Sequence, residues 1–241
     1  MPRKSLVATV ADAVLDGIVR GDLVPGDALP SEAELGAIHD VSRITVREAI
    51  KTLQAQGVIR VENGRGSYVN PVDEWVSLDA VLRITSVGGR DDDVAVQLIE
   101  VRRMLETGAA ALAATRRSDD DLAQLASYVD EMRESSVRGD VDAFVRADLA
   151  FHDVILRASG NVFLRVLFEP LTRVLAERRA QTSRVPEIQA HAIDEHASVL
   201  EALRTGETET SRRAMDRHMD QTMDDLRHYV LDGAGRTEAS A

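Results

Sequence analysis

Apolar residues recur at helical spacing along most of this 241-residue chain, and this periodicity limits the fold more than any other feature. Beyond residue 91 no run alternates between apolar and polar residues with the period of two that a half-buried strand requires. Two short strand-like segments lie near residues 58–69. The pattern predicts a mainly α-helical protein, in which a small helix-and-hairpin region precedes a longer all-α bundle.

The first 57 residues predict three helices separated by turns. Apolar residues three or four apart predict a helix over residues 6–20, which Gly21 ends. A second helix is expected to start at Ser31, because Ser31-Glu32-Ala33-Glu34 has the form of a capping box. Ser42 is the expected N-cap of a third helix that ends at Gly57.

A β-hairpin is expected directly after the third helix. Residues 58–61 and 67–69 have strand-like composition, and the dipeptide Asn63-Gly64 between them is a strong hairpin signal. Three helices followed by a hairpin predict a winged helix-turn-helix over residues 1–70.

A row of basic residues lies on one side of the third helix. Arg43, Arg47 and Lys51 are four residues apart, and Thr45 lies near the helix end that a recognition helix inserts into the major groove. A basic row alone is more often a solvated face. Its place between a capped helix and a glycine-containing hairpin favours DNA contact, for which arginine is well suited.

The charge distribution is compatible with a focused DNA-binding patch. The chain carries a formal net charge of −12, of which residues 1–70 contribute about −1 and residues 71–241 about −11. The acidity therefore lies in the second region, and DNA attraction would come from the local basic row and not from bulk charge.

Three segments of the first region resemble the DNA-binding domain of the GntR family of bacterial transcription regulators over residues 6–70. They are Leu29-Pro30-Ser31-Glu32, Val41-Ser42-Arg43-Ile44-Thr45-Val46-Arg47-Glu48-Ala49 and Gly64-Arg65-Gly66-Ser67-Tyr68-Val69. The resemblance implies that Arg43, Thr45 and Arg47 contact bases and phosphates. It also implies that Gly66 approaches the minor groove, and we place Lys51 and Arg65 on the same surface. Ala33 departs from members that have a DNA-contacting arginine there.

The remainder of the chain predicts a bundle of six to seven helices. Residues 71–90 are expected to form a linker with a short packed helix that Gly88-Gly89 ends, residues 91–231 an effector-binding and dimerisation domain, and residues 232–241 a disordered tail. The expected bundle helices span about residues 92–114, 119–137, 141–158, 161–184, 186–205 and 207–230.

Three of these helices each place a histidine on the inward face. Asp148 and His152 are four residues apart on one apolar stripe, and His196 and His218 share their faces with apolar residues of later helices. Imidazoles with a carboxylate suit a divalent metal ion, and bundles build metal sites from facing helices. A single inward histidine is more often a neutral core residue, so that alternative applies to each one taken alone. His191 is expected on the surface.

Arg102 lies beside the buried stripe of the first bundle helix, where a guanidinium needs an anion. One interpretation is that it receives an effector carboxylate, with Asn161 as a further polar contact. The alternative is an internal pair with Glu106 or Asp148.

The bundle resembles the FCD effector domain of the FadR subfamily over residues 92–230. The resemblance rests on Glu100-Val101-Arg102-Arg103-Met104-Leu105-Glu106, Asp148-Leu149-Ala150-Phe151-His152, Ala158-Ser159-Gly160-Asn161, Asp194-Glu195-His196 and Arg217-His218-Met219. It implies that Asp148, His152, His196 and His218 ligate a divalent ion, with zinc as first choice and nickel or manganese as alternatives. It also implies an effector carboxylate at Arg102.

Several function classes are excluded or disfavoured by composition. Zero cysteines exclude disulfides, thiolate zinc sites and iron–sulfur clusters, and no lysine beyond Lys51 is available for a Schiff base with pyridoxal phosphate. The longest stretch without a charged residue, Thr107 to Thr115, is too short to cross a bilayer. No His follows a Glu by three residues, as a di-iron centre would require. We therefore do not expect an enzyme.

The sequence thus predicts a cytoplasmic, homodimeric transcription regulator, a repressor in our interpretation, that binds an inverted-repeat DNA operator. A small carboxylate from organic-acid or sugar-acid catabolism, bound at the metal site, would change operator affinity. In the alternative hypothesis the bundle only dimerises and binds neither metal nor ligand.

Overall fold

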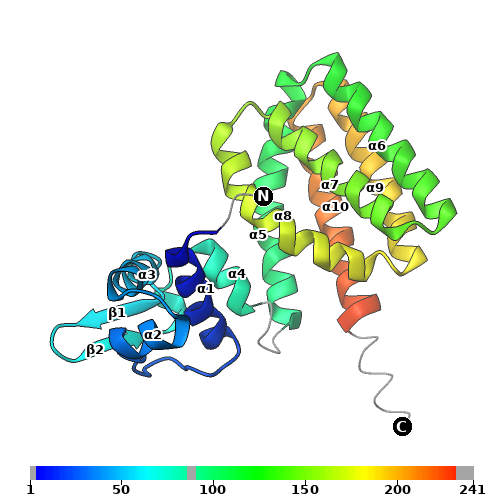
Figure 1. Cartoon of the computed structure of the whole chain (residues 1–241). Coiled ribbons are helices and arrows are strands. Elements are labelled where there is room, and N and C mark those ends of the chain that lie inside the picture. Colours follow the sequence, from blue (N-terminus) through cyan, green and yellow to red (C-terminus); the bar gives the residue numbers. More distant parts are fainter. Residues whose placement is uncertain (1–3, 86–90, 232–241) are drawn as a thin grey trace, which may run out of the picture. The chain divides into compact units, whose positions relative to one another are not determined.

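The computed structural model describes residues 4–85 and 91–231 and divides the chain into two compact units, one up to Asp91 and one from Asp92 (Figure 1). The mainly α-helical fold class predicted from the sequence is confirmed. The predicted end of the linker at Gly88-Gly89 and the predicted tail lie outside the described residues.

The first unit begins with three helices, α1 (Leu6–Val19), α2 (Glu32–His39) and α3 (Arg43–Ala55). The predicted capping box at Ser31 is present, because its hydroxyl accepts from the backbone N–H of Glu34 while the Glu34 side chain accepts from the backbone N–H of Ser31. Ser42 caps α3 through the backbone N–H of Thr45, as expected. Capping therefore sets where the recognition helix begins.

The predicted hairpin follows α3. Strands β1 (Ile59–Glu62) and β2 (Gly66–Val69) are antiparallel, with Ile59 opposite Val69 and Glu62 opposite Gly66. Val58, Ile59 and Val69 are buried in one core with the apolar faces of α1 and α3. This core holds the hairpin against the helices and leaves its tip free.

The segment after the hairpin packs into the first unit. It contains a 3₁₀ turn, η1 (Val72–Glu74), and α4 (Leu78–Thr85), and Trp75 and Ala80 are buried in the same core as α1 and α3. Arg83 on α4 forms ion pairs with Asp12 and Asp16 on α1. The short helix expected in the linker is thus part of the winged unit.

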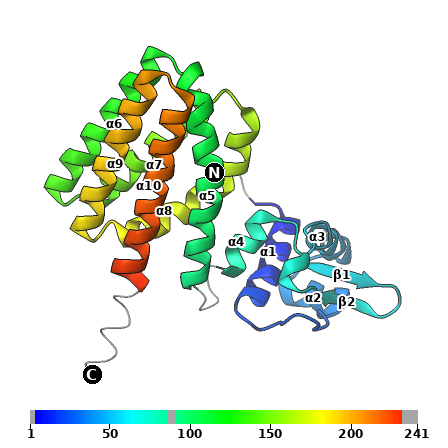
Figure 2. The same ribbon diagram turned by 180° about the vertical axis from the view of Figure 1, so that it is seen from behind.

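The second unit is a helical bundle. It consists of α5 (Asp91–Arg116), α6 (Asp119–Arg138), α7 (Val141–Ala158), α8 (Val162–Thr182), α9 (Pro186–Thr205) and α10 (Thr208–Asp225). Helix α6 packs against α7 and α9, α9 against α10, and α7 against α8 (Figure 2). Buried residues such as Phe144, Phe151 and Met215 fill the interior.

The last predicted helix differs from the expectation at its end. It winds as an α-helix only to Asp225 and continues as a π-helix, η2 (Leu226–Leu231). Leu226 packs there with Ala95 and Ile99 of α5 in a small apolar cluster. No described helix has the length and apolar character needed to cross a membrane.

Candidate functional site

The exposed face of α3 carries the predicted basic row. Val46, Ala49, Ile50 and Leu53 are buried on one side of α3, and Arg43, Arg47 and Lys51 are exposed on the other. The structure therefore brings the three basic residues together on one surface, as the spacing predicted. Thr45 is at the N-terminal end, where its hydroxyl oxygen lies 3.0 Å from that of Ser42.

Two residues of the basic row have acidic partners. The guanidinium of Arg47 donates to Glu32 on α2 at 3.0 Å, and the ammonium of Lys51 donates to Glu48 at 2.9 Å. The hydrogen bond from Arg47 lowers the pKa of Glu32. Arg43 makes no hydrogen bond or ion pair within the part of the chain that the structure describes. It is therefore the cation of the row that is most free to meet a phosphate or base.

The wing presents Arg65 and Gly66 at the tip of the hairpin. Gly66 has a φ of +131°, which favours glycine, and a Cβ added there would meet no atom within 4 Å. Packing against the protein therefore does not require a glycine at this position, whereas close approach to another molecule would be helped by one. Arg65 forms an exposed ion pair with Glu62 at 3.2 Å.

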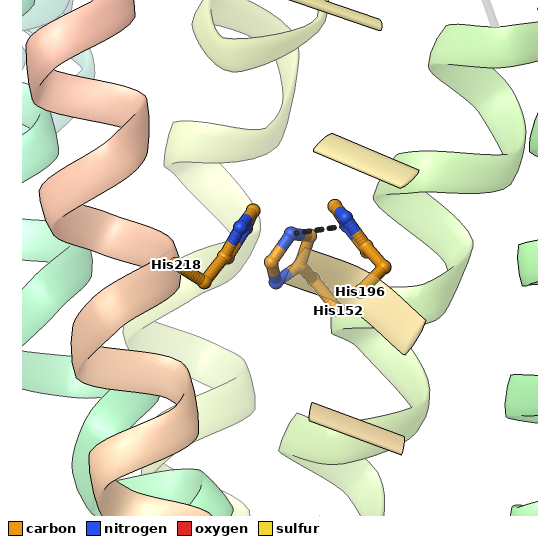
Figure 3. Close-up of side chains that lie close together, drawn as sticks. All are labelled: His152, His196 and His218. Carbon is orange, nitrogen blue, oxygen red and sulfur yellow. Dashed lines mark hydrogen bonds between the residues drawn. The ribbon is translucent and has the colours of Figure 1, made fainter. Parts of the chain in front are cut away.

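In the second unit, three imidazoles from three helices meet in the interior. His152 projects from α7, His196 from α9 and His218 from α10, and one nitrogen of each lies within 4.8 Å of the others (Figure 3). All three side chains are buried. The prediction that these histidines point inward is thus confirmed by their burial.

In both His152 and His196, Nδ1 faces an oxygen and Nε2 faces the other imidazole. Nδ1 of His196 lies 2.6 Å from the carbonyl oxygen of Ala192, and Nδ1 of His152 contacts the carboxylate of Glu106. In a neutral imidazole, an oxygen beside Nδ1 favours the N–H on that nitrogen and leaves the lone pair on Nε2, although the contact of His152 with Glu106 lacks hydrogen-bond geometry. The two Nε2 atoms lie 3.2 Å apart and face the centre of the cluster.

His218 completes the cluster of three histidines, and Asp148 lies beside it next to His196. Oδ1 of Asp148 lies 3.2 Å from Nε2 of His196, and its Oδ2 is buried without a hydrogen-bond partner. Both ring nitrogens of His218 are also buried without a partner. Unpaired buried polar atoms are costly, so their concentration beside the three histidines marks this cluster as the candidate cation-binding site.

Two guanidinium groups border the histidines. Arg102 on α5 donates through Nε to Glu106 at 2.6 Å, and its Nη2 lies 3.4 Å from Nε2 of His152. Arg179 on α8 donates to Asp148, and its Nη2 lies 3.3 Å from the same His152 nitrogen. The internal pair of Arg102 with Glu106, one of the two alternatives raised by the sequence, is therefore present in the structure.

Burial and neighbouring charges set the protonation states of the cluster. Burial lowers the pKa of His152 to about 4, and it also holds the pKa of His218 well below its ordinary value. Burial alone would raise the pKa of Asp148, but the charge of Arg179 outweighs it and holds that pKa below its usual range. At neutral pH His152 and His218 are neutral and Asp148 is ionised, which are the states required for metal ligation.

Sequence reasoning missed Arg179. A signal was present, because Arg179 continues the spacing of the buried residues Leu171 and Leu175 by one further step of four. Asn161, expected near the effector, instead caps α8 by accepting from the backbone N–H of Phe163 at 3.1 Å. His191 is partly exposed, lies 2.9 Å from Asp225 and is not one of the three clustered histidines.

Comparison with known protein families agrees with both units. The model described as "Bacterial regulatory proteins, gntR family" matches residues 6–69, and the FCD domain model matches residues 97–221. The chain belongs to the GntR family. More narrowly, it is a FadR-type member with an FCD domain, and the matched families and relatives are transcription regulators and not enzymes.

Curated relatives cover most of this GntR-family chain. LutR, a helix-turn-helix regulator of Bacillus subtilis, is 31% identical over 88% of this chain and 97% of its own length. The galactonate operon transcriptional repressor of Escherichia coli is 32% identical over 82% of this chain and 86% of its own length. This regulator is therefore similar to both along nearly its whole length.

Solved structures show the same fold. A Streptococcus agalactiae GntR protein is 26% identical, with a TM-score of 0.52 over 90% of this chain and 99% of that chain. The Listeria monocytogenes protein Lar is 24% identical, with a TM-score of 0.59 over 95% of this chain and 100% of that chain. At this level of identity the second likeness concerns the fold alone.

Proposed function

We propose that this DNA-binding regulator holds one divalent metal ion with Asp148, His152, His196 and His218, and that a small carboxylate bound beside the ion controls operator affinity. The observation that carries the proposal is the convergence of hydrogen-bond acceptors. Nε2 of His196 lies 3.2 Å from both Nε2 of His152 and Oδ1 of Asp148, and all three atoms carry lone pairs when the two imidazoles are neutral with the N–H on Nδ1. Acceptors repel one another at this distance unless a cation binds between them.

The geometry suits a metal ion with little rearrangement. Two nitrogens bound to one zinc ion at about 2.1 Å each are at most about 4.2 Å apart. The three imidazole nitrogens already lie within 4.8 Å of one another, so a small inward movement is sufficient. Zinc fits three imidazoles and a carboxylate, and nickel and manganese are the alternatives.

Charge balance indicates that the effector is an anion. Two guanidiniums, Arg102 and Arg179, are balanced by two carboxylates, Glu106 and Asp148, while His152 and His218 are neutral. A divalent ion would leave this buried cluster with an excess of two positive charges, which is costly in a low-dielectric interior. A bound carboxylate would reduce the excess and pair with a guanidinium in bidentate geometry.

A hydroxy acid is the effector class that we favour. A carboxylate and an adjacent hydroxyl can both bind a metal ion with open coordination positions, and the Nη2 atoms of Arg102 and Arg179 lie 3.4 and 3.3 Å from His152 Nε2, beside the proposed ion. One curated relative is named for the galactonate operon, and galactonate is such an acid. We infer that this chain represses genes for the use of a related sugar acid or organic acid.

We also propose that the functional form is a homodimer. Each chain has one recognition helix, and an inverted-repeat operator needs two. Val162, Phe163, Val166 and Leu167 form an apolar face on the first half of α8, with each side chain between 54% and 72% exposed. A second copy of this chain is the occupant that the inverted repeat requires, and we assign this face to the dimer contact.

The decisive experiment is titration of the zinc-loaded protein with galactonate and with galactitol, the polyol without a carboxylate, in an operator-release assay. We expect release by a hydroxy acid and none by the polyol. Arg102→Gln should abolish the response while zinc remains bound. If a panel of small hydroxy acids neither binds nor releases DNA, the effector proposal is wrong, and the hypothesis that the bundle only dimerises takes its place.

A further inference from the structure

An isoleucine occupies the exposed side of the recognition helix, α3. Ile44 lies in the first turn of α3 between Arg43 and Thr45, and 75% of its surface is exposed. A large apolar side chain at a helix surface gains free energy when a partner covers it. Its position raises the question of what covers it when DNA is bound.

Helical geometry shows that Ile44 points almost directly away from the protein core. Each residue of an α-helix is rotated by about 100° from the one before it. The buried residues of α3, Val46, Ala49, Ile50 and Leu53, define the inward direction, and the opposite direction falls at Ile44. Ile44 is therefore the side chain of the first turn that points most directly away from the core.

The surroundings of Ile44 are polar, so it is a single apolar point in a charged surface. Arg47 and Glu48 follow it by three and four residues and are exposed on the same face. The hydroxyl of Thr45 is engaged with Ser42, and Lys51 is engaged with Glu48. Within the described part of the first unit, Ile44 does not belong to the apolar core.

The major groove offers one apolar group on the base edges, the C5-methyl group of thymine. We propose that Ile44 contacts a thymine methyl in each half-site and so determines specificity for thymine over cytosine at one operator position. The arginines of α3 supply charge and hydrogen bonds, which an isoleucine cannot supply. Ile44 instead distinguishes the base pair whose edge carries a methyl group.

The test uses the full chain and a duplex whose thymines are replaced one at a time by deoxyuridine, which lacks the methyl group. The operator is first selected from random duplexes with the wild-type protein. Burial of one methyl group is worth about fourfold in affinity, so we expect about a fourfold loss for one substituted half-site and about 15-fold for both. The Ile44→Ala variant should bind the thymine operator with a similar loss and be insensitive to the uridine.

Two further variants serve as controls. Ile38→Ala removes another exposed isoleucine, 65% exposed on α2, and should keep the wild-type sensitivity to uridine. Ile44→Val removes only the terminal Cδ1 methyl group and should retain part of the sensitivity, which gives a reading even if Ile44→Ala binds too weakly to measure.

The proposal is overturned if no single uridine weakens the wild-type protein. It is also overturned if the Ile44 variants remain as sensitive to uridine as the wild type, because another residue would then contact the methyl group. Coupling between the Ile44 variants and one thymine position supports it.

Discussion

Asp148 on α7 accepts a hydrogen bond from the guanidinium of Arg179 on α8, 31 residues further along the chain. The carboxylate that we assign to the metal therefore has a cationic partner when the metal is absent. Metal and guanidinium both stabilise the same negative charge, so each should reduce the energetic importance of the other.

We expect Arg179→Met to destabilise the metal-free protein by about 3–5 kcal/mol, because it leaves Asp148 buried without its counter-charge. Zinc would supply that charge, so the rise in Tm on adding zinc should be larger for the variant than for the wild type. Thermal unfolding with chelator and with zinc measures both. Arg157→Met, which breaks the exposed pair with Asp153, should change stability by at most about 1 kcal/mol. If zinc raised the Tm of the wild type and of Arg179→Met equally, the metal and Arg179 would not compete for the charge of Asp148.

The stability of the metal-free protein should fall as the pH drops below about 6.5. Burial lowers the pKa of His152 to about 4, whereas an unfolded histidine has a pKa near 6.5. Between these values the unfolded state binds more protons, so stability is fully present above about pH 6.5 and decreases as the pH falls towards 4. His218, whose pKa is also lowered, adds to the effect.

The expected slope is roughly 1.4 kcal/mol per pH unit for each such imidazole. Urea unfolding of chelator-treated protein between pH 7 and pH 5 measures it. His152→Gln should lower the slope by about 1.4 kcal/mol per pH unit, which is the contribution of one imidazole. A flat profile for the wild type would show that these histidines are not held neutral by burial.

Substitutions on α3 should separate base contacts from phosphate contacts. Arg43→Ala should cost about 1–3 kcal/mol at each half-site if a base contact is lost, and Arg47→Ala should do the same. Lys51→Ala should weaken binding to all sequences about equally and reduce its salt dependence. Fluorescence anisotropy with operator and unrelated DNA at several salt concentrations measures these effects. Normal operator affinity for Arg47→Ala would contradict the assignment of the basic row on α3 to DNA contact.

The dimer contact can be tested with a charge on α8. Phe163→Glu should shift the protein from dimer to monomer in light scattering at micromolar concentration, because the contact would bury the carboxylate. Val137→Glu is the matched control, since Val137 is an isolated apolar side chain, 90% exposed on α6. A Phe163→Glu protein that remains fully dimeric would place the interface elsewhere.

Local signals made much of the first unit predictable. The capping box at Ser31, the N-cap at Ser42 and the Asn63-Gly64 turn act through neighbouring residues, so the sequence shows them directly. The packing of α4 against α1 depends on Arg83 meeting Asp12 and Asp16, about 70 residues away along the chain. Such a long-range pair has no local signature.

The candidate site was predictable in its histidines but not in its ion pairs. The apolar stripes around His152, His196 and His218 indicated their inward orientation before the structure was known. Which guanidinium meets which carboxylate depends on how α5, α7 and α8 pack together, and side-chain spacing within one helix does not determine this. A polar residue at a helix start often serves as the N-cap, and Asn161 does so for α8 in the structure, a role that the sequence pattern did not distinguish from an effector contact.

Elemental mass spectrometry of the purified protein measures directly whether the histidine cluster holds a metal ion. After equilibration with zinc and removal of excess metal, the wild type should retain one ion per chain. His218→Ala should retain none while still binding DNA, since both nitrogens of His218 lack a protein partner that the substitution could disrupt. Absence of bound metal in the wild type, together with a Tm that chelator does not change, would contradict the account.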